Sequence, residues 1–309
     1  MSGGTVPDVP VFPPAPAADL EGVHAVPKAY LHLRRDASVF VTGWRRLKDG
    51  EFSLTVRWPT PDEGSPYDPR VLTQTIRQSG LVVAHAAYGV PLSHQTLLHH
   101  FDFTVIPGFR PGPAERRCLT VEITVSGARK PGRTVSSLGM DVRLLQGTTL
   151  VARADSEFGW ISPRAYARVR GDRIGAEWND WPLLPPVAPR TVARATGTDV
   201  VLAPGEGPRH WQLRHDADNT LLYDHPVDHV PGLVLMEAAY QAAHATVHPL
   251  PFEATTVAAR FERYVEFDRP CWIEAEPAHA TGPGQASVAV TGVQDGLPVF
   301  RGRMSGPCG

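Results

Sequence analysis

The stretch Tyr223-Asp-His-Pro-Val-Asp-His-Val-Pro-Gly-Leu-Val-Leu-Met-Glu-Ala-Ala-Tyr-Gln-Ala242 decides how this chain is expected to fold. It predicts an extended approach, a turn at Pro231-Gly232 and then a helix over residues 231–247. Apolar residues lie nearly all round this helix, so we expect it to be buried. Its one carboxylate, Glu237, follows the glycine by five residues. A buried carboxylate is costly unless it is hydrogen-bonded or used in chemistry, and the helix alone leaves both interpretations open.

A second copy of the pattern occurs earlier in the chain. A similar buried helix is predicted over about residues 71–87, and the two helices align when Gln74 is placed opposite Glu237. The alignment then pairs two further positions, Arg77 with Tyr240 and Gln78 with Gln241. The repeat is long, and it therefore indicates duplicated domains rather than a solenoid, whose period would be much shorter.

Strands follow each copy of the helix. Residues 101–105 alternate as a strand does, and their counterpart in the second copy is 261–265. Each copy ends in two strands joined by a short turn, at Gln146-Gly147 and at Asp295-Gly296. We expect four parts in order: a disordered leader at 1–22, an N-terminal unit at 23–170, a Pro-rich linker at 171–197 and a C-terminal unit at 198–306.

Composition narrows the class of protein. The 309 residues are enough for two domains, and a hydrophobic content of 42% supports real cores. The net charge of -2 gives no sign of nucleic-acid binding by bulk electrostatics. Three cysteines without a Cys-x-x-Cys pair argue against a zinc ribbon or a disulfide framework and fit a reducing cytoplasm. No apolar run approaches the length of a membrane span, so we expect no membrane partner.

A long helix wrapped by antiparallel strands, present twice, resembles a double hotdog fold. The run from His225 to Gln241 is similar to the active-site helix of hotdog 3-hydroxyacyl-thioester dehydratases, although its His-to-Pro spacing is shorter. A closer resemblance is to the A-factor (AfsA-type) butyrolactone synthase family of actinobacteria. It rests on these segments: Val26-Pro-Lys-Ala-Tyr-Leu-His32, Gly43-Trp-Arg-Arg46, Thr75-Ile-Arg-Gln78, Ala84-His-Ala-Ala-Tyr-Gly-Val-Pro-Leu92, Asp199-Val-Val-Leu-Ala-Pro204 and Asp224-His-Pro-Val-Asp-His-Val-Pro-Gly232.

The resemblance implies an α+β fold of two tandem hotdog domains packed as a pseudo-dimer. It also implies an acyltransferase in the biosynthesis of a butyrolactone-type autoregulator or a related secondary metabolite. The enzyme would move a β-ketoacyl group from acyl carrier protein, or from CoA, to the hydroxyl of dihydroxyacetone phosphate or a similar small acceptor. No cofactor is implied. A chain that carries its own pseudo-dimer face is compatible with either a monomer or a homodimer.

The two helices depart from the family pattern, which usually has Glu and Arg three residues apart on each helix. Here the first helix carries Gln74 and Arg77, and the second carries Glu237 and Tyr240. We expect Arg77 and Glu237 to form one composite site between the packed units, with Glu237 as general base and Arg77 holding a phosphate or carboxylate of the acceptor. A structural ion pair between them is an equal alternative. Gln74 cannot act as a base, and Tyr240 either donates a hydrogen bond or is a satisfied core residue.

Residues around the start of the second helix complete the predicted site. The backbone N–H of Gly232 is expected to polarise the thioester carbonyl, because a glycine at a helix N-terminus permits close approach. His225, Asp228 and His229 form a polar cluster just before the helix. They lack a further ligand at a convincing spacing, so we expect them to order the start of the helix and contact substrate rather than hold a metal.

Two further groups of charged residues are noted. His94, His99 and His100 are expected to be solvated in a loop. The basic pairs are candidates for docking an acidic carrier protein, with solvated surface as the ordinary alternative: Arg34-Arg35, Arg45-Arg46 and Arg116-Arg117.

Other functions remain open on the sequence. A hotdog dehydratase would need a histidine facing Glu237, with His225 as the local candidate, and a thioesterase would need water at Glu237. A degenerate member that only binds an acyl chain, a butyrolactone or a partner protein is favoured by the absence of Glu at position 74 and of Arg at position 240. A Glu237→Gln variant should stop turnover in an enzyme and barely change a binding protein.

Overall fold

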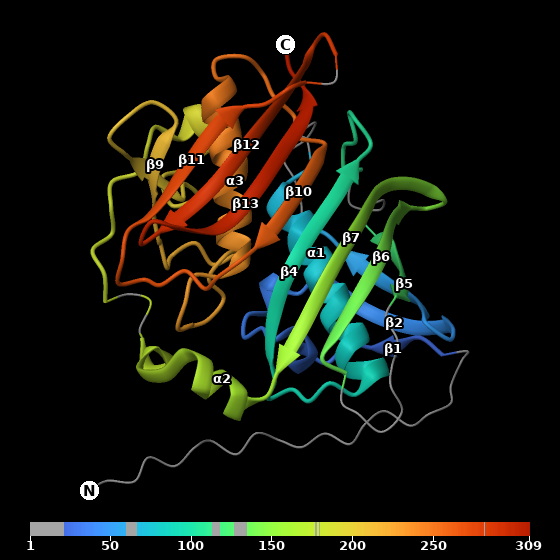
Figure 1. Ribbon diagram of the computed structural model, residues 1–309. Helices are drawn as coiled ribbons and strands as arrows, with labels where there is room; N and C mark the ends of the chain where they lie inside the picture. The colour runs from blue at the N-terminus through green and yellow to red at the C-terminus, as the bar shows by residue number, and fades with distance from the viewer. Residues whose placement is uncertain are drawn as a thin grey trace, which may run out of the picture.

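The computed structural model describes residues 22–59, 67–112, 118–126, 135–176, 178, 180–280 and 282–309, and the expected leader lies outside them except for Gly22. The framework of the protein is one antiparallel sheet of 13 strands, in the order β1-β2-β3-β5-β6-β7-β4-β10-β13-β12-β11-β9-β8. The long helices α1 and α3 lie on the same face of this sheet, one behind each half (Figure 1).

The N-terminal half contains these elements: β1 (His24–Ala25), the 3-10 helices η1 (Lys28–Leu31) and η2 (Asp36–Ser38), β2 (Val41–Lys48), β3 (Glu51–Arg57), α1 (Pro69–Val82), the π-helical turn η3 (Val83–Ala87), β4 (Gln95–Val105), β5 (Cys118–Ser126), β6 (Ser137–Gln146) and β7 (Thr149–Ile161). The start of α1 follows from its sequence. Asp68 caps the helix by accepting a hydrogen bond from Arg70 N–H at 2.9 Å, and Pro69 occupies the first turn, where its missing N–H costs nothing.

The remaining elements are α2 (Pro163–Arg170), the 3-10 helices η5 (Gly171–Gly175) and η6 (Pro189–Val192), β8 (Leu202–Pro204), β9 (His210–Leu213), α3 (Gly232–Val247), β10 (Thr256–Phe261), β11 (Cys271–Pro277), β12 (Gln285–Gln294) and β13 (Leu297–Pro307). The Pro-rich segment expected as a linker packs on the C-terminal half. Val192 in this segment is completely buried, and Val187 N–H donates to Leu202 O at 3.0 Å.

The two halves join where β4 pairs with β10. The strands run antiparallel, with Thr104 opposite Thr256 and His100 opposite Arg260. Outward from this seam both halves repeat the same order, β7-β6-β5-β3-β2 on one side and β13-β12-β11-β9-β8 on the other. The chain therefore forms two tandem hotdog units that share one sheet as a pseudo-dimer, which confirms the predicted fold class.

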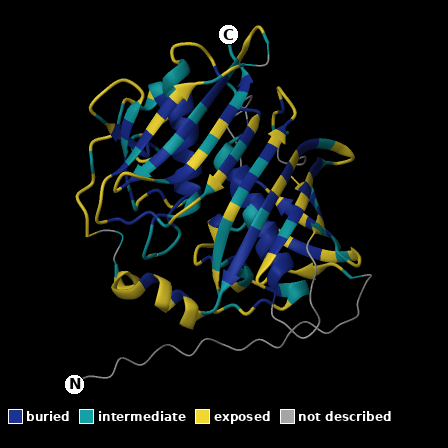
Figure 2. Ribbon diagram, in the orientation of Figure 1, coloured by how far each residue is buried: buried dark blue, intermediate teal, exposed yellow. Residues whose placement is uncertain are grey.

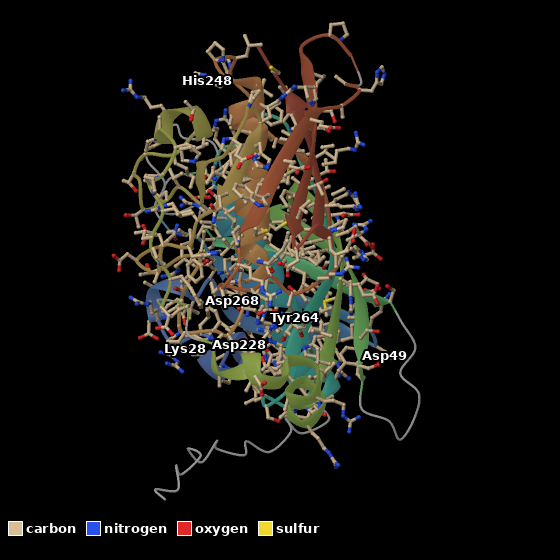
Figure 3. All side chains as sticks on the ribbon, turned by 60° about the vertical axis from the view of Figure 1, so that its left-hand side comes forward. Lys28, Asp49, Asp228, His248, Tyr264 and Asp268 are labelled. Carbon is tan, nitrogen blue, oxygen red and sulfur yellow. The ribbon has the colours of Figure 1, made fainter. Side chains whose placement is uncertain are left out.

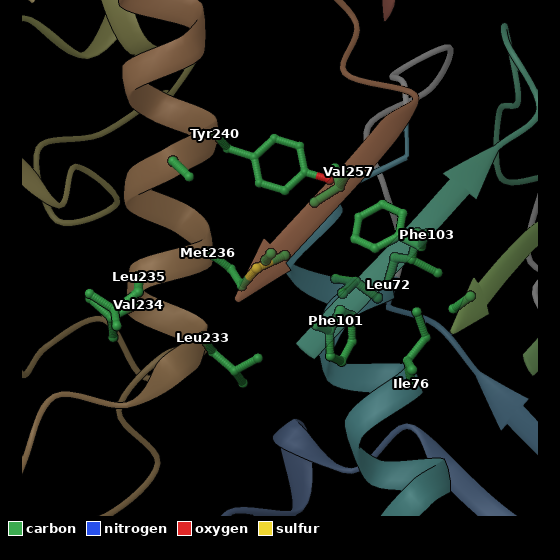
Figure 4. Close-up of a cluster of buried hydrophobic side chains, with 14 of the residues drawn as sticks. Leu72, Ile76, Phe101, Phe103, Leu233, Val234, Leu235, Met236, Tyr240 and Val257 are labelled. Atoms are coloured by element: carbon green, nitrogen blue, oxygen red, sulfur yellow. The ribbon is translucent and has the colours of Figure 1, made fainter. Parts of the chain in front are cut away.

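Apolar side chains fill the space between the helices and the seam. All ten residues labelled in Figure 4 have 7% or less of their surface exposed: Leu72, Ile76, Phe101, Phe103, Leu233, Val234, Leu235, Met236, Tyr240 and Val257. Burying one such side chain contributes about 1.5–3 kcal/mol. Both long helices are mostly buried, whereas α2 is mostly exposed (Figure 2), so the core between α1, α3 and the seam strands holds the two halves together.

One pair of aligned polar residues has the same role in both halves. Gln78 on α1 is buried and accepts hydrogen bonds from the backbone N–H groups of Phe40 at 2.9 Å and Val41 at 3.2 Å. Gln241 on α3 is also buried and accepts from Val201 N–H at 2.9 Å. Each amide ties its helix to the segment that leads into an outer strand and satisfies a backbone donor there. The repeat inferred from the alignment is thus visible in side-chain contacts.

Two local expectations are wrong. The strand expected at 261–265 is displaced, because β10 ends at Phe261 and the next residues leave the sheet. Val265 and Phe267 are buried outside any strand, so their alternation reflects a loop packed on the core. His99 and His100 lie on β4 rather than in a loop.

Candidate functional site

A cavity of about 490 Å³ lies between the two halves, beside the start of α3. The N-terminal half supplies part of its wall from α1, from the residue after η1 and from the start of β4. The C-terminal half supplies the segment 222–235, which includes the first turn of α3, and residues 261–265. The volume is typical of a small-molecule site. Neither half forms this cavity alone.

The N-terminus of α3 opens into the cavity through Gly232. Its N-cap is Pro231, no side chain caps it, and its first turn contains no acidic residue. The first N–H groups and the positive end of the helix dipole are therefore available to a ligand. A Cβ atom at Gly232 would lie 3.1 Å from Phe261 Cε1, so the glycine keeps open a space that a side chain would fill.

Arg77 brings a guanidinium from α1 to the same cavity. Its Nη1 donates to Leu31 O at 3.4 Å, and it forms no ion pair with any described residue. Burial lowers the pKa of Arg77 to about 10, and the nearby Asp224 carboxylate offsets this only in part. The side chain is thus still charged at neutral pH. A half-buried guanidinium that forms no ion pair with a described residue favours an anionic ligand.

Gln74 lies one helical turn before Arg77 and also lines the cavity. Its Nε2 donates to Leu221 O at 3.1 Å, which fixes the orientation of the amide. Its Oε1 is buried and has no hydrogen-bond partner among the described residues. A buried acceptor without a partner costs free energy, so a donor group on a ligand would be stabilised here.

The segment before α3 holds two histidines in the cavity wall, each against a carboxylate. His225 Nδ1 lies 3.1 Å from Asp224 Oδ2, and Asp224 also accepts backbone N–H groups of the 34–35 segment at 2.5 and 2.9 Å. His229 Nδ1 lies 2.7 Å from Asp228 Oδ1. His225 and His229 therefore line the cavity, whereas Asp228 does not line it and contacts His229 from behind.

Helix α2 secures this segment. Tyr166 donates its hydroxyl to Asp228 at 2.6 Å, and Arg170 contacts Asp228 at 3.2 Å and Glu266 at 2.6 Å. Although burial opposes ionisation, these donors and His229 hold the pKa of Asp228 at about 2. The Arg170 guanidinium also lies 4.7 Å from the centre of the Tyr264 ring. Asp228 and Tyr264 appear close together at the lower end of the molecule in Figure 3.

Glu237 and Tyr240 do not line this cavity, contrary to the expected composite site with Arg77. Glu237 is completely buried in an ion pair with Arg194, at 2.5 Å from Nε to Oε1 and 2.7 Å from Nη2 to Oε2. The alternative ion pair between Glu237 and Arg77 is wrong as well, because Arg194 takes both carboxylate oxygens. Tyr240 is buried with its ring stacked on Phe103, and burial raises its pKa well above the usual value.

Pseudo-symmetry explains why the aligned pairs separate. Gln74 and Arg77 face the N-terminus of α3, so Glu237 and Tyr240 face the N-terminus of α1 at Pro69 and Arg70. The cavity at that second position has a volume of only about 10 Å³, room for one water at most. The protein therefore has two related positions at its seam, one open and one closed.

Ion pairs fill the closed position. Asp68 already caps α1, and Arg70 pairs with Asp68 at 2.8 Å and with Asp199 at 2.5 Å. Arg194 adds the pair with Glu237, and only 10% of its side chain is exposed. Burial works against the charge of Arg194, but Glu237 more than offsets this and raises its pKa.

Sequence reasoning missed three residues of these two positions. Arg194 lies in the segment taken as a linker, and nothing in its surroundings signals a partner 43 residues away. His32 lines the open cavity, and His85 contacts His32 from η3, the turn that follows α1. A signal for both histidines was present, because each lies in a segment that carries the family resemblance.

No group of three or more His, Cys, Asp or Glu side chains in the described part of the chain is arranged to hold a metal ion. Among the described residues, no helix is long and apolar enough to cross a membrane.

Comparison with known proteins gives consistent matches. The sequence matches the family described as A-factor biosynthesis hotdog domain over residues 15–162 and 177–308. A 2-oxo-3-(phosphooxy)propyl 3-oxoalkanoate synthase from Streptomyces virginiae is 43% identical over 284 residues, covering 89% of this chain and 95% of that protein. A synthase of the same name from Streptomyces coelicolor is 34% identical over 288 residues, covering 91% of each.

Similarity to solved structures is more distant. The 12:0-ACP thioesterase from Umbellularia californica aligns with a TM-score of 0.49 and 12% identity, over 83% of this chain and 94% of that one, which does not bear on function. The family match and the identity to the Streptomyces relatives both extend over most of the sequence. This chain belongs to the A-factor biosynthesis hotdog family.

Proposed function

We propose that this protein transfers a 3-oxoacyl group from a thioester to the hydroxyl of dihydroxyacetone phosphate, giving a 2-oxo-3-(phosphooxy)propyl 3-oxoalkanoate. The names of the relatives support this product. The observation that carries the proposal is that the unpaired guanidinium of Arg77 and the uncapped N-terminus of α3 open into one cavity. Two positive features fit a reaction in which one substrate carries phosphate and the other develops an oxyanion.

The chemistry requires the thioester carbonyl to be polarised and the acceptor to be held beside it. The N–H groups of the first turn of α3, beginning at Gly232, supply the first function. Arg77 supplies the second by holding the phosphate. Gln74 Oε1 is the buried acceptor that would receive a hydrogen bond from the acceptor molecule. Apolar residues in the cavity wall suit a 3-oxoacyl chain: Leu97, Leu98, Phe158, Ile161, Leu233 and Phe261.

The thioester donor is proposed to be an acyl carrier protein or CoA in the cytoplasm. Of the three basic pairs, Arg34-Arg35 lies beside the cavity, because its backbone N–H groups bind Asp224. Arg45-Arg46 lies on β2, and Arg116-Arg117 lies outside the described residues. The pair at residues 34–35 is therefore the one suited to receive an acidic carrier at the cavity mouth.

The dehydratase alternative finds no support in the geometry. It needs a histidine facing Glu237, but the described hydrogen-bond partners of that carboxylate are Arg194 and Gln241. A role limited to binding is disfavoured by the relatives, which are named as synthases.

Intact-protein mass spectrometry tests the proposal. A 3-oxoacyl carrier protein is mixed with the protein, with and without dihydroxyacetone phosphate, and the small-molecule fraction is analysed for the phosphorylated ester. We expect loss of the acyl group only when the acceptor is present, with the ester as product. An Arg77→Met variant should lose the reaction, whereas Arg143→Met, at an exposed ion pair with Glu122, should keep it. Hydrolysis without acceptor would instead identify a thioesterase, and no acyl loss in either sample would refute the transferase.

A further inference from the structure

Two histidines from distant parts of the sequence meet at the wall of the open cavity. His32 lines the cavity, and its Nε2 lies 2.8 Å from Nε2 of His85. His85 Nδ1 in turn lies 2.7 Å from Val90 O. The result is a chain of hydrogen bonds from the cavity to the backbone, and nothing in the reaction described so far uses it.

Unusual backbone conformations bring the pair together. His32 closes η1 in the left-handed region, with φ 52° and ψ 39°, which few residues other than glycine adopt. His85 lies in the π-helical turn η3 that follows α1. Both conformations are costly and persist only where the surrounding structure fixes them, and both are common at functional sites. Here one such conformation positions His32 and the other positions His85, and these are the two partners of one hydrogen bond.

The hydrogen bonds determine which nitrogen carries each proton. Val90 O can only accept, so His85 Nδ1 carries a proton and donates it. Burial lowers the pKa of His85, so the ring is neutral at neutral pH and its Nε2 has a lone pair. His32 must then donate from Nε2. A neutral His32 with its proton on Nε2 has a lone pair on Nδ1, the nitrogen needed by a base.

Charged and titratable groups around His32 keep it neutral. Its pKa is lowered to about 3 by burial first and then by His85, Arg77 and His225. Arg77 is close because it donates to Leu31 O, the carbonyl just before His32. A phosphate bound to Arg77 would place negative charge here, oppose that repulsion and raise the pKa of His32. The phosphorylated acceptor would thus strengthen the base that acts on it.

Building on the proposed function, we propose that His32 is the general base for the acceptor hydroxyl and that His85 is its positioning residue. His32 Nδ1 takes the hydroxyl proton as the oxygen attacks the thioester carbon and the C–O bond forms. The resulting imidazolium is stabilised by its Nε2–H bond to His85. When the C–S bond breaks, Nδ1 returns the same proton to the leaving thiolate, so thioester and alcohol become ester and thiol with no other reactant.

His99, His225 and His229 also line the cavity. His225 and His229 differ from His32 because each binds a carboxylate through Nδ1, on the segment before α3, and His99 lies on β4. His32 follows Leu31 directly, and the Leu31 carbonyl accepts the hydrogen bond from Arg77, the residue proposed to hold the phosphate. Only three carbons separate the phosphate oxygen from the hydroxyl in the proposed acceptor, so the base has to lie near Arg77, and His32 meets this requirement.

Nitrogen NMR of the histidine-labelled, full-length protein tests the pair without any turnover. We expect His32 as the Nε2–H tautomer and His85 as the Nδ1–H tautomer. Inorganic phosphate should raise the pKa of His32 in the wild type and leave it unchanged in Arg77→Met. An Nδ1–H tautomer at His32, or no phosphate-linked shift in the wild type, would overturn the proposal even if the protein were inactive with every acceptor tried.

Kinetics of the acyl transfer give the second test. His32→Gln should lower kcat by about 10²–10⁴-fold with little change in KM for the acceptor. His85→Phe should lower kcat less and disturb the His32 tautomer. His100→Asn is the matched control and should keep full activity, because His100 is half-buried on β4 beside Asp155 and does not line the cavity. Wild-type turnover with undiminished kcat in His32→Gln would remove His32 as the base and leave the proposed function standing.

Discussion

Replacing Glu237 by glutamine is expected to weaken the fold and leave the chemistry intact. The carboxylate has no exposed surface and receives hydrogen bonds from Arg194 at 2.5 and 2.7 Å and from Gln241 at 2.5 Å. The amide would leave the Arg194 guanidinium buried without its counter-charge, and Arg70 is a second cation nearby. Removing one partner of a buried pair costs about 3–5 kcal/mol. At roughly 2 °C per kcal/mol this lowers Tm by about 6–10 °C.

A double-mutant cycle measures the same interaction directly. Urea unfolding of the wild type, Glu237→Met, Arg194→Met and the double variant gives the coupling free energy. Each single change should destabilise the protein strongly, whereas the double variant should recover most of the loss because no buried charge is left unpaired. Glu122→Gln, at an exposed ion pair with Arg143, is the control and should change stability by less than about 1 kcal/mol.

Turnover decides between a structural and a catalytic Glu237. Below the melting transition, Glu237→Gln should retain kcat per folded molecule within about 3-fold, because its carboxylate faces the closed position. A variant with unchanged Tm and a kcat lowered by two orders of magnitude would refute this reasoning. The sequence-based expectation of a general base would then be correct.

Three other predictions concern the open cavity and the segment that supports it. Arg77→Lys should raise KM for the phosphorylated acceptor by about 10–100-fold, since an ammonium cannot bind phosphate through two parallel hydrogen bonds; a non-phosphorylated acceptor should respond far less in steady-state kinetics. Gly232→Ala should lower kcat with circular dichroism unchanged, because the new methyl would crowd Phe261 at 3.1 Å and narrow the approach to the helix N-terminus. Asp228 has a folded pKa of about 2, below its unfolded value of about 3.9, so its stabilisation is present above pH 4 and is lost as pH falls toward 2. Between pH 4 and pH 2, the unfolding free energy of Asp228→Asn should therefore change by about 2 kcal/mol less than that of the wild type. An equal pH dependence in the two proteins would contradict the low pKa of Asp228.

The fold was predictable because its signals are local and occur twice. Buried helices with aligned Gln78 and Gln241, followed by alternating strands, specify a duplicated unit. The displaced strand at β10 marks the limit of this reasoning. Val265 and Phe267 alternate like strand residues because a loop buries them, and periodicity alone does not distinguish the two cases.

The site was only partly predictable because its members meet through tertiary structure. Five residues that the sequence singled out line the open cavity: Gln74, Arg77, His225, His229 and Gly232. Sequence reasoning combined Arg77 with Glu237 because it could not tell which helix end each residue faces. Which helix end each residue faces depends on how the two halves join at the β4–β10 seam. This pairing places the aligned residues of each helix beside the N-terminus of the other helix. His32 and His85 were missed because 53 residues separate them and one lies in a π-helical turn.

The closed position at the seam has a consequence for how the two halves tolerate change. A homodimer of identical hotdog units has to build both of its sites from the same sequence, so a substitution that fills one fills the other. A chain that carries both units escapes this constraint. In this protein the closed position holds a cluster of buried ion pairs that joins the two halves, whereas the open position keeps its cavity. Substitutions at the two positions should therefore fall under different selection, for folding at Arg194 and Glu237 and for turnover at Arg77. Because residues of both halves line the open cavity, neither half should keep it when the two are separated.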